Sequence, residues 1–184
     1  HDRDLLEGFP RTIQSQGRLG TGSPSADGDS SPAFADLDGD NRNELIFATS
    51  DGFVHAIRPD GTELSGWPVR GDRPSFVDSH VSAPAYASGA VGSNLGAAFL
   101  AAVAVGDTDG DGVPEVYAAD FEGRLYGWGP DGNRVFTEAT RAAYSGKPPA
   151  PFENVRNGKT NRTQRGFFGS PVLADLDGDG DEEI

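Results

Sequence analysis

Residues 36–44 read Asp-Leu-Asp-Gly-Asp-Asn-Arg-Asn-Glu, which places acidic side chains at the first, third, fifth and ninth positions of the stretch. The same spacing occurs at 107–115, Asp-Thr-Asp-Gly-Asp-Gly-Val-Pro-Glu, and at 175–183, Asp-Leu-Asp-Gly-Asp-Gly-Asp-Glu-Glu. A shift of 71 residues aligns the first stretch and the 20 residues after it with the second stretch without a gap. The chain of 184 residues therefore contains an internal repeat, and the centre of each copy is an acidic loop.

Turn sequences divide each copy into short segments. In the first copy, Asp51-Gly52 and Pro59-Asp60-Gly61 favour tight turns on either side of a β-rich segment. We expect antiparallel strands at 31–35, 44–49, 53–58 and 62–65, and in the second copy at 102–106, 115–120, 124–129 and 133–136. Four short antiparallel strands per repeat predict an all-β fold, a β-propeller fragment of four-stranded blades with the acidic loops between strands.

The repeats also predict the domain organisation, which is one partial β-propeller over residues 1–184. Residues 6–10, Leu-Glu-Gly-Phe-Pro, match 64–68, Leu-Ser-Gly-Trp-Pro, so the chain is expected to open with the end of an earlier copy. The expected parts are the end of a preceding blade at 1–12, blades at 31–69 and 102–136, the start of a further blade at 169–184, and long insertions at 70–101 and 137–168. Because insertions on a rigid scaffold often carry binding residues, they are the expected contact surfaces for a partner.

The acidic loops have the composition of a cation site. Three carboxylates gathered around one centre repel each other and raise their pKa values unless a hard cation compensates them. Ca²⁺ accepts six to eight oxygen ligands in flexible geometry, whereas Mg²⁺ prefers to keep several waters. The expected calcium ligands are Asp36, Asp38, Asp40, the carbonyl of Arg42 and Glu44; Asp107, Asp109, Asp111, the carbonyl of Val113 and Glu115; and Asp175, Asp177, Asp179, the carbonyl of Asp181 and Glu183.

An EF-hand is the obvious competing interpretation, and the spacing excludes it. That motif requires a bidentate glutamate at the twelfth position of the loop. Here the twelfth position is Phe47 in the first loop and Ala118 in the second, and both lie in an expected strand. No amphipathic helix is expected on either side of these loops, so calcium would be held between strands.

The loop spacing resembles that of the FG-GAP and VCBS-type calcium-binding blades, whose loop reads Asp-x-Asp/Asn-Gly-Asp-Gly-x-x-Asp/Glu between two strands. The resemblance covers roughly half of the chain, at 31–69, 102–136 and 169–184. It implies a propeller of seven or eight blades with calcium in the interstrand loops, in an extracellular or cell-surface protein. The Gly66-Trp67-Pro68 ending is more similar to bacterial-type blades than to those of integrin α chains.

Composition limits the remaining function classes. The chain carries 29 acidic and 15 basic residues, a formal net charge of −14, and such a surface disfavours nucleic acid as a partner. It has no cysteine, which excludes thiolate metal sites. The longest apolar run, 97–105, is too short to span a bilayer, so no membrane-spanning segment is expected in this chain.

The sequence contains no arrangement of nucleophile and base that would identify an enzyme. We therefore expect an extracellular binding, adhesion or scaffolding module with a protein or carbohydrate ligand, in which calcium is structural. The alternative is a part of a secreted propeller enzyme, such as a polysaccharide lyase, with its catalytic groups on loops. Trp67, Trp128 and His55 lie at or near expected strands, and we expect them to pack rather than to bind a ligand.

Overall fold

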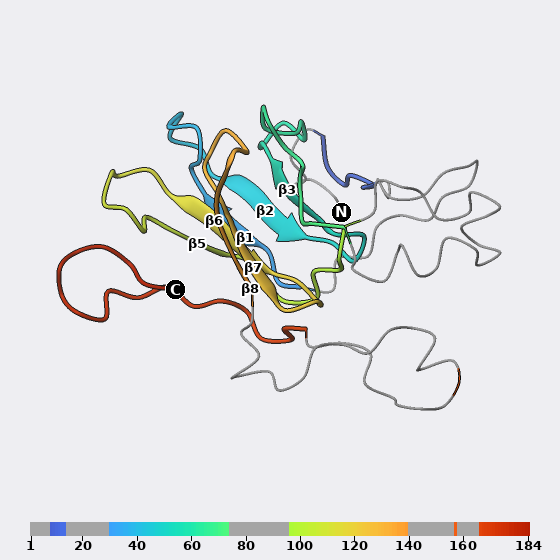
Figure 1. Cartoon of the computed structure of the whole chain (residues 1–184). Helices are drawn as coiled ribbons and strands as arrows, with labels where there is room; N and C mark the ends of the chain where they lie inside the picture. The colour runs from blue at the N-terminus through green and yellow to red at the C-terminus, as the bar shows by residue number, and fades with distance from the viewer. Residues whose placement is uncertain (1–7, 14–29, 74–95, 140–156, 158–165) are drawn as a thin grey trace.

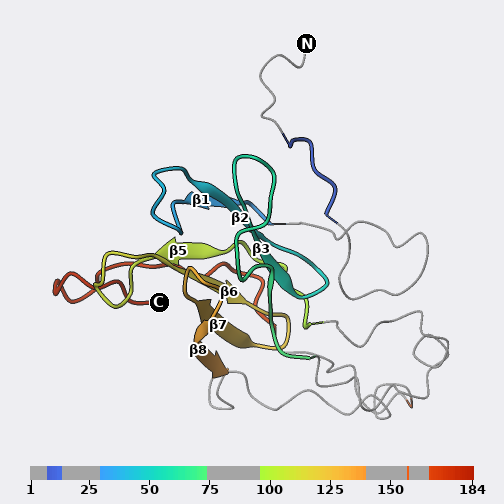
Figure 2. The same ribbon diagram turned by 90° about the horizontal axis from the view of Figure 1, so that it is seen from above.

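The computed structural model describes residues 8–13, 30–73, 96–139, 157 and 166–184. These residues form an all-β structure of two four-stranded antiparallel sheets, and none of them lies in a helix. The strand order is β1-β2-β3-β4 in the first sheet, here unit 1, and β5-β6-β7-β8 in the second, here unit 2. The two sheets lie side by side, with β1 next to β5 (Figures 1 and 2).

Each unit is a meander in which consecutive strands pair. In unit 1 the strands are β1 (Ala33–Ala35), β2 (Glu44–Ala48), β3 (Phe53–Ile57) and β4 (Val69–Arg70). In unit 2 they are β5 (Ala104–Gly106), β6 (Glu115–Ala119), β7 (Arg124–Trp128) and β8 (Arg134–Ala139). The first three strands of each unit lie within the ranges expected from the sequence. The turn glycines Gly52 and Gly123 have φ values of +85° and +83°, which explains why glycine follows the acidic residue there.

The fourth strand of unit 1 differs from the expectation. Residues 62–65 stay beside the end of β3 through the bridge between Ile57 and Glu63 and the bond from the Leu64 N–H to the Ala56 carbonyl, but the strand that closes the sheet is β4. Pro68 has no N–H for a ladder bond, and the indole N–H of Trp67 donates instead to the carbonyl oxygen of Pro130 in unit 2, at 2.9 Å. The expected strand at 62–65 is therefore reduced to a bridge, and the fourth strand resumes as β4 after the segment of Trp67 that contacts the neighbouring unit.

Unit 2 has no such departure, and β8 is continuous. It extends beyond the expected end at 136 to Ala139, with an irregularity in register between Gly127 and Trp128. The expected insertions at 70–101 and 137–168 lie mostly outside the described residues.

One hydrophobic cluster joins the two sheets. Both tryptophans and His55 are buried, as expected, with Trp128 2% exposed. Strand register identifies the faces that meet: Ile46 pairs with Ala56 in unit 1, and Val116 pairs with Trp128 in unit 2. Other members of the cluster on these two faces are Ala48, Val54, Ala118 and Tyr126.

These two faces are not equivalent. The 71-residue shift aligns Val116 with Leu45, not with Ile46, so unit 2 uses the face that corresponds to the far side of unit 1. Successive side chains on a strand point to opposite faces, which makes the contact head-to-tail. A head-to-tail contact propagates to further copies and closes into a ring when the rotation per copy allows it.

A second contact between repeats is made by backbone. Gly66 has φ +89°, and a Cβ built on it would lie 1.9 Å from the carbonyl oxygen of Asp131. Gly8 has φ +90°, and its Cβ would lie 2.2 Å from the carbonyl oxygen of Asp60. The two Gly-aromatic-Pro segments therefore sit in the same way against Pro-Asp-Gly turns that are 71 residues apart.

Candidate metal centres

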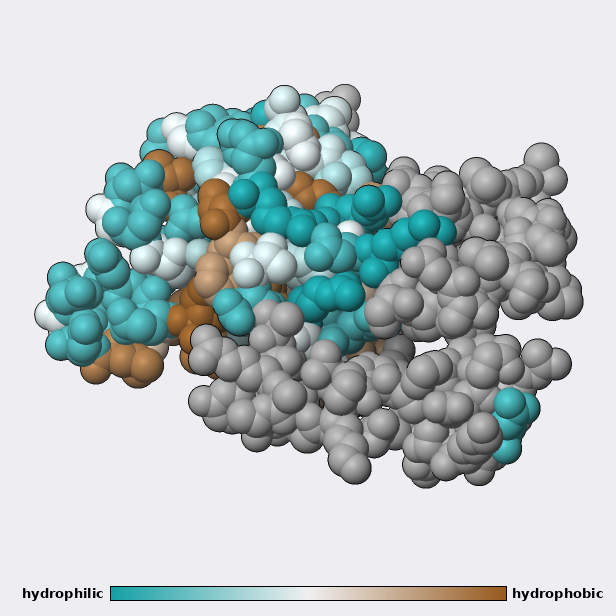
Figure 3. Space-filling view, in the orientation of Figure 1, coloured by the Kyte–Doolittle hydropathy of each residue, from teal (hydrophilic) through white to brown (hydrophobic). Residues whose placement is uncertain are grey.

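The three acidic stretches form loops at one end of the molecule (Figures 1 and 2). We call them loop 1 (36–44), between β1 and β2; loop 2 (107–115), between β5 and β6; and loop 3 (175–183), whose ends are bridged by Ala174 and Glu183. This end of the surface is mostly hydrophilic in Figure 3. The position of loops 1 and 2 follows from the meander, because each of them connects the first two strands of its unit.

Carboxylates converge in all three loops. In each group the ligand atoms lie within 4.8 Å of one another. The groups are Asp36, Asp38 and Asp40 in loop 1; Asp107, Asp109 and Glu115 in loop 2; and Asp175, Asp177 and Glu183 in loop 3. In loop 1 the fifth-position aspartate therefore takes the place that the glutamate takes in the other two.

The first aspartate of each loop organises the backbone. Asp36 Oδ2 accepts the Asn41 N–H at 2.8 Å, and Asp107 Oδ2 accepts the Gly112 N–H at 2.7 Å. Asp175 Oδ2 accepts the equivalent N–H, that of Gly180, at 3.2 Å. The residue that donates has a positive φ in all three loops, 64° at Asn41, 85° at Gly112 and 103° at Gly180. Asparagine tolerates a positive φ better than most residues. Loop 1 therefore makes the same turn with Asn41 that the other two loops make with glycine.

The fifth aspartates and the seventh residues are linked by the same bond in each loop. Oδ1 of the fifth-position aspartate accepts the N–H of the seventh residue, at distances of 2.8, 2.8 and 3.0 Å, in the pairs Asp40–Arg42, Asp111–Val113 and Asp179–Asp181. The sequence predicts that the carbonyl oxygens of these seventh residues are calcium ligands. The hydrogen bonds above involve their N–H groups, so they do not test the role of the carbonyls. That part of the ligand set stays a prediction.

The ninth-position glutamates have a role that the spacing alone does not reveal. Glu44 Oε2 accepts the Leu37 N–H at 2.9 Å, and Glu183 Oε2 accepts the Leu176 N–H at 2.7 Å. Glu115 Oε2 accepts both the N–H and the hydroxyl of Thr108, each at 3.0 Å. In every loop the glutamate is therefore bonded to the second residue, and in loops 1 and 2 this ties the start of the loop to the strand that follows it.

Glu44 provides a direct test of whether these residues fit a cation. Its side chain is fully buried, and its second oxygen, Oε1, has no hydrogen-bond partner. Burial raises the pKa of this carboxyl above its ordinary value of 4.5, and the neighbouring carboxylates of Asp38, Asp40 and Asp36 raise it further. A buried carboxylate oxygen without a donor beside three more carboxylates is the environment that a bound cation compensates.

This environment leads to a prediction for the metal-free protein. The variant Glu44→Gln removes the uncompensated buried charge, while its amide oxygen still accepts the Leu37 N–H. We therefore expect the free energy of unfolding of the variant to be about 1 kcal/mol larger than that of the wild type. Because the raised pKa lets the folded state hold a proton that the unfolded chain releases, wild-type stability falls as pH rises above 4.5, and the variant lacks this component. Urea unfolding with chelator at several pH values measures both effects.

The matched control is Glu115→Gln. Its carboxylate receives two hydrogen bonds from Thr108, and we therefore expect no stabilisation from its removal. Equal changes in the free energy of unfolding of the two variants would contradict the prediction that the unpartnered Glu44 oxygen destabilises the metal-free protein.

Loops 2 and 3 are in contact. A Cβ on Gly110 would lie 2.4 Å from Asp181 Oδ1, and the Glu182 N–H donates to the Asp107 carbonyl at 3.4 Å. Desolvation and the carboxylates of Asp179, Asp107, Asp109 and Glu183 raise the pKa of the Asp181 carboxyl. The negative charge of loop 3 is therefore added to that of loop 2.

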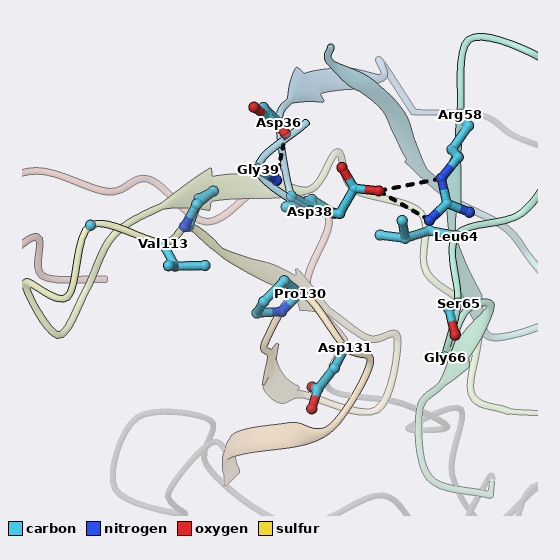
Figure 4. Close-up of a pocket in the computed structure, with 13 residues that line it drawn as sticks. Asp36, Asp38, Gly39, Arg58, Leu64, Ser65, Gly66, Val113, Pro130 and Asp131 are labelled. Carbon is cyan, nitrogen blue, oxygen red and sulfur yellow. Dashed lines mark hydrogen bonds and ion pairs between the residues drawn. The ribbon is translucent and has the colours of Figure 1, made fainter. Parts of the chain in front are cut away.

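Loop 1 borders a cavity of about 610 Å³ between the two units (Figure 4). Its walls include Leu37 and Leu64 from unit 1, Val113 and Pro130 from unit 2, and the Gly66 backbone. The Arg58 side chain lies on this cavity and points to Asp38, with which it forms an ion pair.

The structure thus defines an all-β protein with two paired four-stranded sheets and acidic loops whose carboxylates could hold a metal ion. No family model matches the chain, and no curated protein matches its sequence. A helix with the length and apolar character required to cross a membrane is not found within the described ranges.

Proposed function

We propose that this chain is part of an extracellular calcium-binding β-propeller of the FG-GAP/VCBS type, acting as a binding, adhesion or scaffolding module in which calcium is structural. The propeller is supported by the head-to-tail contact, in which Ile46 and Ala56 of unit 1 meet the non-equivalent face of unit 2. It is also supported by the repeated packing of Gly8 and Gly66 on successive Pro-Asp-Gly turns.

The observation that carries the calcium proposal is the threefold recurrence of one hydrogen-bond arrangement around converging carboxylates, with a buried unpartnered oxygen on Glu44. Oxygen-only ligands without nitrogen or sulfur favour a hard cation. The flexible coordination of Ca²⁺ suits a loop that supplies several carboxylates better than the strict octahedron of Mg²⁺ does.

Bound calcium would offset two of the negative charges of each loop and, in loops 1 and 2, hold the connection between two strands. In loop 1, Asp36, Asp38, Asp40 and Glu44 would hold the ion, and Asp36 and Glu44 already fix the backbone on either side. The ion would add no chemistry beyond charge compensation, which is why we assign it a structural role. Ligand recognition is then left to other surfaces, for which a protein or a carbohydrate is the proposed partner.

Titration of the metal-free chain with CaCl₂ in a calorimeter tests this proposal. We expect binding at up to three sites with dissociation constants of about 10⁻⁴–10⁻³ M, the range of extracellular modules. Asp109→Asn should remove one site, because it takes a charged member out of the loop 2 group. Glu138→Gln on β8 is the matched control, because its side chain is exposed and lies outside the three carboxylate groups. Equal heats for both variants, or no binding heat at all, would refute a calcium site in loop 2.

A further inference from the structure

Loop 1 differs from loop 2 in carrying its own positive partner. Arg58 donates from Nη2 to Asp38 Oδ2 at 3.0 Å and from Nε to the same oxygen at 3.3 Å (Figure 4). Its Nη1 donates to the Glu63 carbonyl at 3.3 Å, which fixes the guanidinium beside the loop. Arg58 therefore contacts one of the three carboxylates that converge in loop 1.

The second repeat lacks this partner. The 71-residue shift aligns Arg58 with Gly129 and Asp38 with Asp109. Asp109 Oδ1 accepts the Asp111 N–H, as Asp38 Oδ1 accepts the Asp40 N–H, both at 3.3 Å. Within the described part of the chain, no lysine or arginine forms an ion pair with Asp109. The two loops thus share this turn hydrogen bond and differ in two cationic residues, Arg42 in place of Val113 and Arg58 in place of Gly129. Of these two, Arg58 is the one that forms an ion pair with a loop 1 carboxylate among the described residues.

We propose that Arg58 is a built-in competitor for the cation of loop 1, so that loop 1 binds calcium more weakly than loop 2. This inference rests on the proposed calcium function. Arg58 occupies Asp38 Oδ2 with two donors, and the positive charge of Arg58 repels an incoming divalent ion. The buried Glu44 carboxylate, with its unpartnered Oε1, still favours a cation in the same loop. Loop 1 consequently responds to calcium at higher concentration than loop 2.

The size of the effect follows from Coulomb's law. A single positive charge roughly 5–6 Å from a divalent cation in solvent-like surroundings lowers the affinity about tenfold. The Arg58 and Asp38 side chains are 30% and 27% exposed, so their surroundings are less polar than water and tenfold is the lower bound of the effect. The same exposure makes the effect sensitive to salt, which screens charges near the surface.

The experiment isolates loop 1 in the full chain by the substitutions Asp109→Asn and Asp177→Asn. Calcium is titrated calorimetrically into this protein and into the same protein carrying Arg58→Gln or Arg58→Lys. Arg58→Gln should tighten binding about tenfold at low salt and by less at 0.5 M NaCl. Arg58→Lys retains the charge and should change the affinity little.

The reciprocal variant is Gly129→Arg in the protein with loop 2 intact and loop 1 removed by Asp36→Asn. The φ of Gly129 is not positive, and a Cβ there would meet its nearest atom at 3.5 Å, so the backbone accepts a residue other than glycine. We expect weaker calcium binding by loop 2.

The outcomes separate the two proposals. Unchanged or weaker binding by Arg58→Gln would mean that Arg58 positions Asp38 rather than competing for it, and would overturn this inference alone. The absence of calcium binding in every protein, including the unmodified chain, would overturn the proposed function and this inference with it.

Discussion

Gly66→Ala is expected to destabilise the chain by about 3 kcal/mol, because a methyl group there combines backbone strain with a collision. Gly66 has φ +89°, and its Cβ would lie 1.9 Å from the Asp131 carbonyl oxygen and 2.7 Å from the Asp131 carbonyl carbon. These are backbone atoms of a turn and cannot rotate away as a side chain can. The measurement is urea unfolding of the full chain, with and without calcium.

Gly129→Ala is the matched control for this substitution. Gly129 lies next to the same turn, has no positive φ, and offers ordinary van der Waals distances of 3.5 Å and more to a Cβ. We expect a change within about 0.5 kcal/mol. Gly8→Ala should behave like Gly66→Ala, because its Cβ would meet the Asp60 carbonyl at 2.2 Å. If Gly66→Ala lowered the free energy of unfolding as little as Gly129→Ala, the close backbone contact between Gly66 and Asp131 would be contradicted.

Removing calcium is expected to cost the protein about 3 kcal/mol of stability. At a calcium concentration roughly thirty times the dissociation constant of loop 2, that site contributes about 2 kcal/mol and the tenfold weaker loop 1 site about 0.8 kcal/mol. For a chain of this size the loss corresponds to a fall in melting temperature of roughly 6–12 °C. The measurement is thermal unfolding with calcium, with magnesium and with chelator.

Two comparisons make this result specific. Magnesium should restore only part of the lost stability, because it keeps its waters and fits the carboxylate groups less well. Asp109→Asn should reduce the calcium-dependent shift, and Glu138→Gln should leave it intact. A melting temperature that does not change with chelator would mean that the three loops are acidic turns that do not bind calcium.

The repeat spacing accounts for most of what the sequence could predict. The turns at Gly52 and Gly123 and the acidic loops are local features, and they place the first three strands of each unit correctly. The carboxylates predicted at the first and third positions also meet in space in all three loops. Such features depend on residues close in the chain, where turn chemistry dominates.

Tertiary contacts account for what the sequence missed. The fourth strand of unit 1 is interrupted at Trp67, whose indole donates to the Pro130 carbonyl, 63 residues away. The pairing of Arg58 with Asp38 spans 20 residues and has no counterpart in the second copy, so the repeat gave no sign of it. The bond from each ninth-position glutamate to the second residue of its loop likewise appears only when both strand ends are placed.

The contact between units has two different sides, and a single repeat carries both of them. Unit 1 supplies Gly66 to the turn of unit 2, while its own Asp60 turn receives Gly8 from the segment before it. Duplication of one such coding segment therefore adds a donor and an acceptor surface together, and the new copy fits its neighbours without any further mutation. Unit 2 continues as β8 where unit 1 has Gly66-Trp67-Pro68, so the junction of unit 2 with a following copy would differ from the one that unit 1 makes.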